Sequence, residues 1–321
     1  MPQAHDRLFR RVFSDPEQAC GELQHLLPAV VSAQIDWRSL ELVPGSFVDQ
    51  ALSERRSDVL FTVQLGGQPF LLYLLLEHQS TADPLMPFRL LSYMVRIWDE
   101  HLERNPQARL LPAIAPLVVH HSERGWTAPK RFEQILALPE DALEALRPNL
   151  PSFELLLDDL SVERDEALRE RVLLPALAKL SLLCLKWSRQ SPDIFEELRR
   201  SASLVEEVSG APNGVAALSA IVSYLLEVSD ATPQKVGTIL RQLGPKTGEA
   251  VMTFEQYFEE KGRVQGEARG EARAILKILE RRGIALSDAE RERVGTCQDL
   301  LQLDAWLEHA LAVSSASELF S

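Results

Sequence analysis

Apolar and polar positions alternate most clearly over residues 57–80, which read SDVLFTVQLGGQPFLLYLLLEHQS. Two strand-like runs flank Gly66 and Gly67, a pair that is typical of a tight hairpin turn. Apolar residues then recur at helical spacing from about Pro87 to Arg104, which predicts a helix. The run LPAIAPLVVHHS, from residue 111, is rich in β-branched and small residues and predicts a buried strand.

Helical patterns dominate the two ends of the chain. Residues 5–27 predict a helix with Asp6 as its N-cap, and Asp15-Pro16 is expected to restart it. Residues 29–54 have a weaker pattern, in which a short strand is expected near Leu40–Val43. After residue 130 the strand signals fade, and helices are expected over residues 131–146, 163–189, 192–208, 214–228, 232–243 and 248–282.

The order of these elements predicts the fold class. A helix, a hairpin, a second helix and a strand follow one another over the first ~125 residues, which favours an α/β fold with a mixed sheet. The two prolines of RPNLPSFELL suggest a boundary near residue 150. We therefore expect an α/β domain over residues 1–150, a helical region over 151–282 and a small helical module over 283–321.

Composition and charge limit the cellular locations and the classes of function that fit the sequence. The chain has 321 residues, 45% of them hydrophobic and 25% charged, and its apolar runs are shorter than the ~18 residues of a membrane span. The N-terminus has no signal-peptide pattern, and the three widely spaced cysteines favour reduced thiols in a cytoplasmic protein. The net charge of −13 argues against indiscriminate coating of nucleic acid. A nuclease is still compatible with the sequence, because arginines concentrate in its N-terminal part.

Two acids at the end of the hairpin are the strongest chemical signal. A two-residue turn pairs Asp58 with Leu75 and makes Asp58 a diagonal neighbour of Glu77, with Cβ atoms roughly 7 Å apart or less. A four-residue turn puts the two acids directly opposite each other. Both turns also place Gln79 on the face of Asp58 and Glu77, because side chains alternate along a strand. An odd-numbered loop or a bulge would separate them.

Carboxylates this close repel each other unless one is protonated or a cation lies between them. Oxygen ligands without cysteine or clustered histidine favour Mg²⁺ or Mn²⁺, which suit phosphodiester hydrolysis because they polarise the phosphoryl oxygen and activate water. The alternative is structural. In that case Asp58 begins a strand near the surface, and Glu77 ends one in solvent beside Arg55 or Arg56.

The acid, the strand turn and the following Glu-x-Gln resemble the core of PD-(D/E)XK nucleases. More specifically, the chain resembles the Rpn family of recombination-promoting nucleases, also described as putative transposases of YhgA type. The resemblance is carried by HDRLFRRVFSDPEQA at 5–19, SDVLFTV at 57–63, LLEHQSTADPLMPFRLLSYMVRIW at 75–98 and LPAIAPLVVHHSERGW at 111–126. It implies a restriction-endonuclease-like mixed sheet flanked by helices and followed by an all-helical C-terminal region.

The resemblance also implies an activity, that of a DNA endonuclease linked to recombination or mobile elements. Asp58 and Glu77 would bind Mg²⁺ or Mn²⁺. Gln79 would orient the attacking water, at the position where the wider superfamily usually has lysine. Glutamine carries no charge, so a slower catalyst is expected. Two alternatives stay open: a weak or inactive nuclease fold that binds DNA or protein, and a hydrolase of small phosphorylated molecules.

Further residues are candidates for the same site. Arg55, Arg56 and Arg89 would contact DNA phosphates, although Arg89 suits an ion pair with Glu77 equally well. His5 and Asp6 read as an N-cap pair or as site residues. The first helix of the superfamily sometimes gives an acid to the metal, and Glu17 or Glu22 would fill that role. Tyr93, four residues after Arg89, shares its helix face.

Two local features complete the picture. Where the family tends to show Tyr-His-Gly after the third strand, this chain has His120-His121-Ser122. In the last long helix, Gly262, Gly266 and Gly270 recur every four residues. Such a row lets a second helix approach closely and predicts a homodimer seam, while a flexible hinge is the alternative reading.

Overall fold

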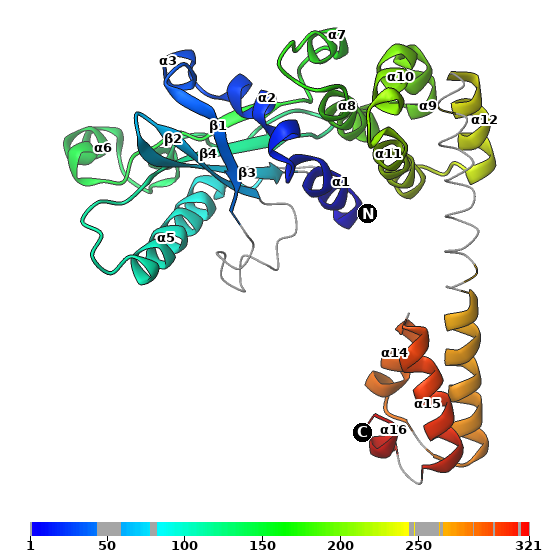
Figure 1. Ribbon diagram of the computed structural model, residues 1–321. Coiled ribbons are helices and arrows are strands. Elements are labelled where there is room, and N and C mark those ends of the chain that lie inside the picture. Colours follow the sequence, from blue (N-terminus) through cyan, green and yellow to red (C-terminus); the bar gives the residue numbers. More distant parts are fainter. Residues whose placement is uncertain are drawn as a thin grey trace. The chain divides into compact units, whose positions relative to one another are not determined.

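The computed structural model describes residues 2–43, 59–77, 82–243, 247, 263, 266–284, 286–297, 299–313 and 316–320. The chain divides into two compact units, Met1–Ala250 and Val251–Ser321. The first unit holds a five-stranded mixed sheet with helices on both faces, and the second is helical where it is described (Figure 1). The predicted fold class, a mixed α/β sheet followed by a helical C-terminal region, is confirmed.

The sheet has the strand order β1-β2-β3-β4-β5. Its strands are β1 (Ile35–Leu42), β2 (Val59–Leu65), β3 (Gln68–Glu77), β4 (Ala113–His120) and β5 (Leu156–Asp159). The first three strands pair antiparallel, whereas β3, β4 and β5 run parallel. The carboxyl ends of the parallel strands meet at one edge of the sheet, where Glu77 pairs with His120 and His120 pairs with Asp159.

The hairpin between β2 and β3 turns through Gly66 and Gly67, whose φ angles are 58° and 79°. Both lie in the left-handed region that glycine adopts without steric cost, and two such residues match the twist of a two-residue hairpin. Leu65 therefore pairs with Gln68, and the register continues unbroken to Val59 opposite Leu74. The predicted two-residue turn is confirmed.

Helix α5 (Met86–Arg104) covers one face of the sheet. Its start is one residue earlier than predicted. Alternate residues of the strands contribute to the core beneath it, as expected when side chains alternate between two faces. This core consists of Leu60, Tyr73, Leu75, Met86, Leu90, Tyr93, Ile97, Val118 and Leu155.

The opposite face is covered by helices from both ends of the first unit. Figure 1 shows α2 (Pro16–Leu26) across the sheet from α5. Helix α1 (Pro2–Phe13) packs against α8 (Ala176–Gln190) and α11 (Gly214–Val228). The predicted N-cap role of Asp6 is wrong, because α1 already begins at Pro2. Asp15 caps α2 by accepting a 3.0 Å hydrogen bond from the backbone NH of Glu17.

Strand β5 corrects the expectation that strands end before residue 130. It begins just beyond the boundary predicted near residue 150 and extends the sheet of the preceding domain. The remaining elements of the first unit are α3 (Ala29–Ser32), η2 (Phe132–Ile135), α6 (Glu140–Leu146), η3 (Arg147–Asn149), α7 (Asp165–Arg169), α9 (Ile194–Arg200), α10 (Ala202–Gly210) and α12 (Pro233–Leu243).

The second unit packs α14 (Asp288–Thr296), α15 (Leu300–Ala312) and α16 (Ala316–Leu319) around the helical residues 266–281. Gly266 and Gly270 are exposed, and Gly262 lies outside the described residues. The homodimer seam therefore stays a prediction. Among the described residues, no helix is both long and apolar enough to cross a membrane.

Candidate active site at the carboxyl edge of the sheet

The predicted catalytic residues fall at the edge where the parallel strands end. Outside the described residues lie Asp58, Gln79, Arg55 and Arg56. Glu77 is the last described residue of β3, and only its backbone, paired with His120, is described. The two-residue turn, which in a continued register sets Asp58 opposite Leu75 and diagonal to Glu77, is confirmed by the hairpin register. The proximity of the two carboxylates itself stays a prediction.

His120, at the end of β4, is fully buried in this edge. Its Nε2 lies 3.0 Å from Oγ of Ser122. The ring of Trp126 meets the imidazole edge to face, with centroids 5.1 Å apart and planes 86° apart. The ring of His120 is thus held in one orientation beside the backbone of Glu77.

Asp159 ends β5 and shapes the loop that follows β4. Its Oδ2 accepts a 2.7 Å hydrogen bond from the backbone NH of Trp126, and its Oδ1 accepts one of 3.1 Å from Ser161. Gly125 has a φ of 85°, and a Cβ there would lie 3.1 Å from Oδ2 of Asp159. This loop therefore requires glycine, and the two oxygens of Asp159 are engaged with the loops after β4 and β5 respectively.

Gln190, the last residue of α8, fastens two loops of this edge together. Its Nε2 donates to the carbonyl oxygens of Ser122 at 3.1 Å and Ser161 at 2.8 Å. The backbone NH of Ser122 also donates to Oγ of Ser161 at 2.8 Å. A residue well beyond position 150 therefore completes the edge formed by β4 and β5. Sequence reasoning missed Gln190, which has no local signal.

Arg89 and Tyr93 lie on α5, at the face turned to the sheet. Arg89 forms an ion pair with Asp83, with 3.2 Å between Nη1 and Oδ2, and its side chain is 16% exposed. Tyr93 is buried, with its ring centroid 5.7 Å from that of Tyr73. Arg89 thus has an acidic partner from the loop before α5, while Tyr93 belongs to the core.

His5, on α1, lies in a buried cluster with Tyr224 of α11 and His121, which follows β4. Its Nδ1 is 2.9 Å from the hydroxyl of Tyr224, and its ring centroid is 4.9 Å from that of His121. Burial raises the pKa of Tyr224, which keeps the hydroxyl protonated. The cluster joins α1 and α11 to the residue that follows β4. Asp6, the next residue along α1, is half-buried.

Glu22, on α2, belongs to a buried ionic cluster on the face opposite α5. Arg171 donates from Nη1 to Glu22 at 2.9 Å, and from Nη1 and Nη2 to Asp158 at 2.7 and 2.8 Å. Arg171 also contacts Glu163. Burial, together with the nearby Asp158, raises the pKa of Glu22 well above its ordinary value. Burial also acts to raise the pKa of Asp158, but the hydrogen bonds from Arg171 lower it overall.

The same cluster offers a possible donor set for a metal. His25, Asp158 and Glu163 each present a ligand atom, and these atoms lie within 4.8 Å of one another. However, Arg171 already binds both oxygens of Asp158 and brings a positive charge to the same place. The set therefore fits an ion-pair cluster better than a cation site.

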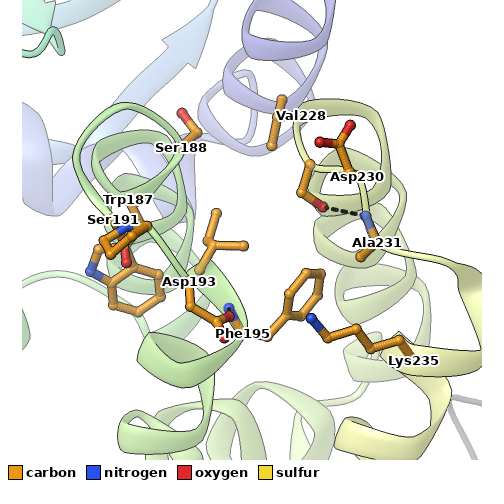
Figure 2. Close-up of a pocket in the computed structure, with 12 residues that line it drawn as sticks. Trp187, Ser188, Ser191, Asp193, Phe195, Val228, Asp230, Ala231 and Lys235 are labelled. Atoms are coloured by element: carbon orange, nitrogen blue, oxygen red, sulfur yellow. Dashed lines mark hydrogen bonds between the residues drawn. The ribbon is translucent and has the colours of Figure 1, made fainter.

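A separate cavity of about 350 Å³ lies where the α8–α9 and α11–α12 corners meet (Figure 2). Nζ of Lys235 lies 5.5 Å from the ring centre of Phe195, inside this cavity. Asp193 caps α9 there by accepting a 3.0 Å hydrogen bond from the NH of Phe195. The volume falls in the range of small-molecule pockets. The sequence gives no signal for it, because four helices supply its walls.

The mixed sheet, its tight hairpin and the covering helices are consistent with a nuclease-like fold. The chain matches the model of the family described as "Putative transposase, YhgA-like" over residues 3–215, and it belongs to this family. The resemblance found in the sequence is thus confirmed.

Relatives from Escherichia coli (strain K12) extend the match over most of the chain. Recombination-promoting nuclease RpnA is 29% identical over 289 residues, which cover 89% of this chain and 92% of the relative. Recombination-promoting nuclease RpnC is 29% identical over 259 residues, or 80% of this chain and 81% of the relative. Inactive recombination-promoting nuclease-like protein RpnE is 26% identical over 278 residues, covering 86% and 88%. No solved structure matches the chain.

Proposed function

We propose that the chain is a metal-dependent DNA endonuclease of the Rpn type, linked to recombination or mobile elements. The observation that supports this most directly is the register of the β2–β3 hairpin. Its two-residue turn is the one that makes Asp58 a diagonal neighbour of Glu77 if the register continues. Two relatives named recombination-promoting nucleases, each aligned over four-fifths or more of this chain, support the reaction class.

In this proposal Asp58 and Glu77 hold one Mg²⁺ or Mn²⁺ ion. The bound ion supplies positive charge to the phosphoryl oxygens during hydrolysis. Gln79 orients the attacking water through its amide oxygen, which accepts a hydrogen bond but carries no charge.

Arg55, Arg56 and Arg89 would hold the DNA backbone on either side of the scissile bond. Arg89 is already paired with Asp83 at 3.2 Å, so a phosphate must compete with that carboxylate. We therefore expect Arg89 to contribute less to DNA affinity than Arg55 or Arg56. The salt dependence of binding would show this, since each phosphate contact adds to the slope.

The second candidate function is that of a nuclease fold which binds DNA or protein with little or no cleavage. The relative named as inactive, RpnE, aligns with 86% of this chain and so gives this candidate a specific basis. The uncharged Gln79 points in the same direction. Both candidates use the same fold, so a cleavage assay separates them.

The test is nicking of supercoiled plasmid in Mg²⁺ or Mn²⁺, with wild type beside Glu77→Gln. This substitution keeps the size of the side chain and removes its charge. We expect a loss of more than about 100-fold, because even the outer-shell partners of metal ligands cost 10- to 100-fold. The matched control is Glu103→Gln, an exposed acid near the end of α5, which should nick at the wild-type rate.

The outcomes are distinct. Equal nicking by wild type and Glu77→Gln would refute the proposed metal site. DNA binding without nicking by the wild type, at any concentration of either ion, would favour the second candidate.

A further inference from the structure

The residue of β4 that pairs with Glu77 in the parallel ladder is His120. Neighbouring strands lie about 4.8 Å apart, so paired positions bring two residues within reach of each other. Neither composition nor spacing singled out His120 as a residue of the site. Its place in the ladder sets it beside the acid on which the proposed reaction depends.

The imidazole of His120 is fixed on several sides. It is fully buried, its ring packs edge to face with that of Trp126, and its Nε2 lies 3.0 Å from Oγ of Ser122. The same Oγ accepts a 2.9 Å hydrogen bond from the NH of Gly125. Its hydrogen can go to Nε2 of His120 at 3.0 Å, or to two acceptors that are farther away, the Gly125 carbonyl at 3.4 Å and Oγ of Ser161 at 3.5 Å. The shortest contact favours donation to Nε2.

This arrangement selects a tautomer. When Nε2 of a neutral imidazole accepts a hydrogen bond, the ring proton is on Nδ1. His120 then carries one N–H donor, and a carboxylate is its natural acceptor. Carboxylates that ligate a metal ion are themselves hydrogen-bonded by outer-shell partners, which fix the orientation of the ligand.

Ser122, which holds the ring of His120, is itself held by Gln190. Gln190 holds the carbonyl of Ser122 at 3.1 Å, so α8 restrains the loop whose hydroxyl orients the ring.

We propose that His120 is a positioning residue of the active site, which holds the carboxylate of Glu77 through Nδ1 while Ser122 fixes its ring through Nε2. The proposal rests on the proposed function, because it assigns Glu77 to the metal. It adds a residue outside the acid pair and the following glutamine.

The test uses two substitutions of His120, each of which keeps a polar group near the place of only one ring nitrogen. The amide of asparagine lies near the place of Nδ1, and the longer side chain of glutamine reaches toward that of Nε2. His120→Ala should weaken Mn²⁺ binding, measured by titration calorimetry on the full chain, by about 10- to 100-fold. His120→Asn should restore most of this affinity. His120→Gln should instead restore the melting temperature and leave Mn²⁺ binding weak.

Plasmid nicking gives a second readout, in which the Mn²⁺ concentration for half-maximal rate should follow the binding constants. His101→Ala, on the far end of α5, is the matched control and should bind Mn²⁺ like the wild type. Wild-type Mn²⁺ affinity in His120→Ala, with binding lost in Glu77→Gln, would overturn the role of His120 and leave the proposed function standing. Equal loss of affinity and melting temperature in the asparagine and glutamine variants would show a structural role only and would also overturn it. Unchanged Mn²⁺ binding in Glu77→Gln would remove the proposed function itself.

Discussion

Replacing Arg171 by methionine tests how the sheet is joined to the helices on its second face. The guanidinium donates to Glu22 at 2.9 Å and to Asp158 at 2.7 and 2.8 Å. The side chains of Arg171 and Asp158 are only 4% and 5% exposed. Methionine fills much of the same volume, so the main effect of Arg171→Met is to leave the carboxylate of Asp158 buried without its cation.

Breaking a buried ion pair by removing one partner costs roughly 3–5 kcal/mol. In a unit of about 250 residues, each kcal/mol lowers the melting temperature by roughly 2–4 °C. We therefore expect the melting temperature to fall by roughly 6–20 °C at pH 7. The loss should be smaller in acid. The pKa of Asp158 is lowered in the folded state, so its stabilisation is present above the ordinary pKa and disappears as pH falls through the depressed one.

The assay is scanning calorimetry of the wild type, Arg171→Met and the double variant Arg171→Met/Asp158→Asn. The double variant removes the stranded charge and should recover part of the lost stability. A loss of less than about 1 kcal/mol, or a double variant less stable than Arg171→Met, would contradict the assignment of Arg171 as a buried charge partner.

Three further substitutions probe single features. In Glu22→Gln, a neutral side chain replaces a carboxyl group whose pKa is raised in the folded state, so the stability that the carboxyl group contributes is lost as pH rises through that pKa. The variant should have the melting temperature of the wild type near pH 4 and a higher one at pH 9, and identical curves of melting temperature against pH would contradict this. In Gly21→Ala, the new Cβ would overlap the backbone carbonyl of Leu173, so the free energy of unfolding in urea should fall by about 1–3 kcal/mol, although alanine has the better helix propensity. An unchanged urea midpoint would count against the close packing. Gly66→Val should cost about 1–2 kcal/mol because φ there is 58°, whereas Gly66→Asn should be nearly neutral, and equal midpoints for the two variants would refute the turn argument.

Local chemistry made part of the fold predictable. The hairpin follows from a glycine pair between alternating strands, and α5 follows from apolar spacing over five turns. Strand β5 has neither signal, because its four residues, LLDD, end in two acids. Asp158 is stable there only because Arg171, from a later loop, neutralises it. Such a strand is specified by its partners in space, and a sequence pattern cannot show them.

The candidate site likewise contains residues that the sequence predicts and one that it does not. Asp58, Glu77 and Gln79 emerged from a motif and a register argument, both of which are local. The contact of Gln190 with the loop after β4 joins residues 68 positions apart and uses an ordinary exposed-type side chain. Its function depends on where α8 ends, which no spacing in the sequence indicates.

The contact between Glu22 and Arg171 spans 149 positions of the chain, and this has a consequence for synthesis on the ribosome. At 5–20 residues per second, roughly 7–30 s separate the appearance of α2 from that of its cationic partner. During this interval the carboxyl group of Glu22 and the face of α2 that packs against α8 are made but not covered. The nascent chain must keep these surfaces from other chains until α8 emerges. A ribosome-bound chain stopped before Arg171 should therefore engage chaperones more strongly than one stopped after α11.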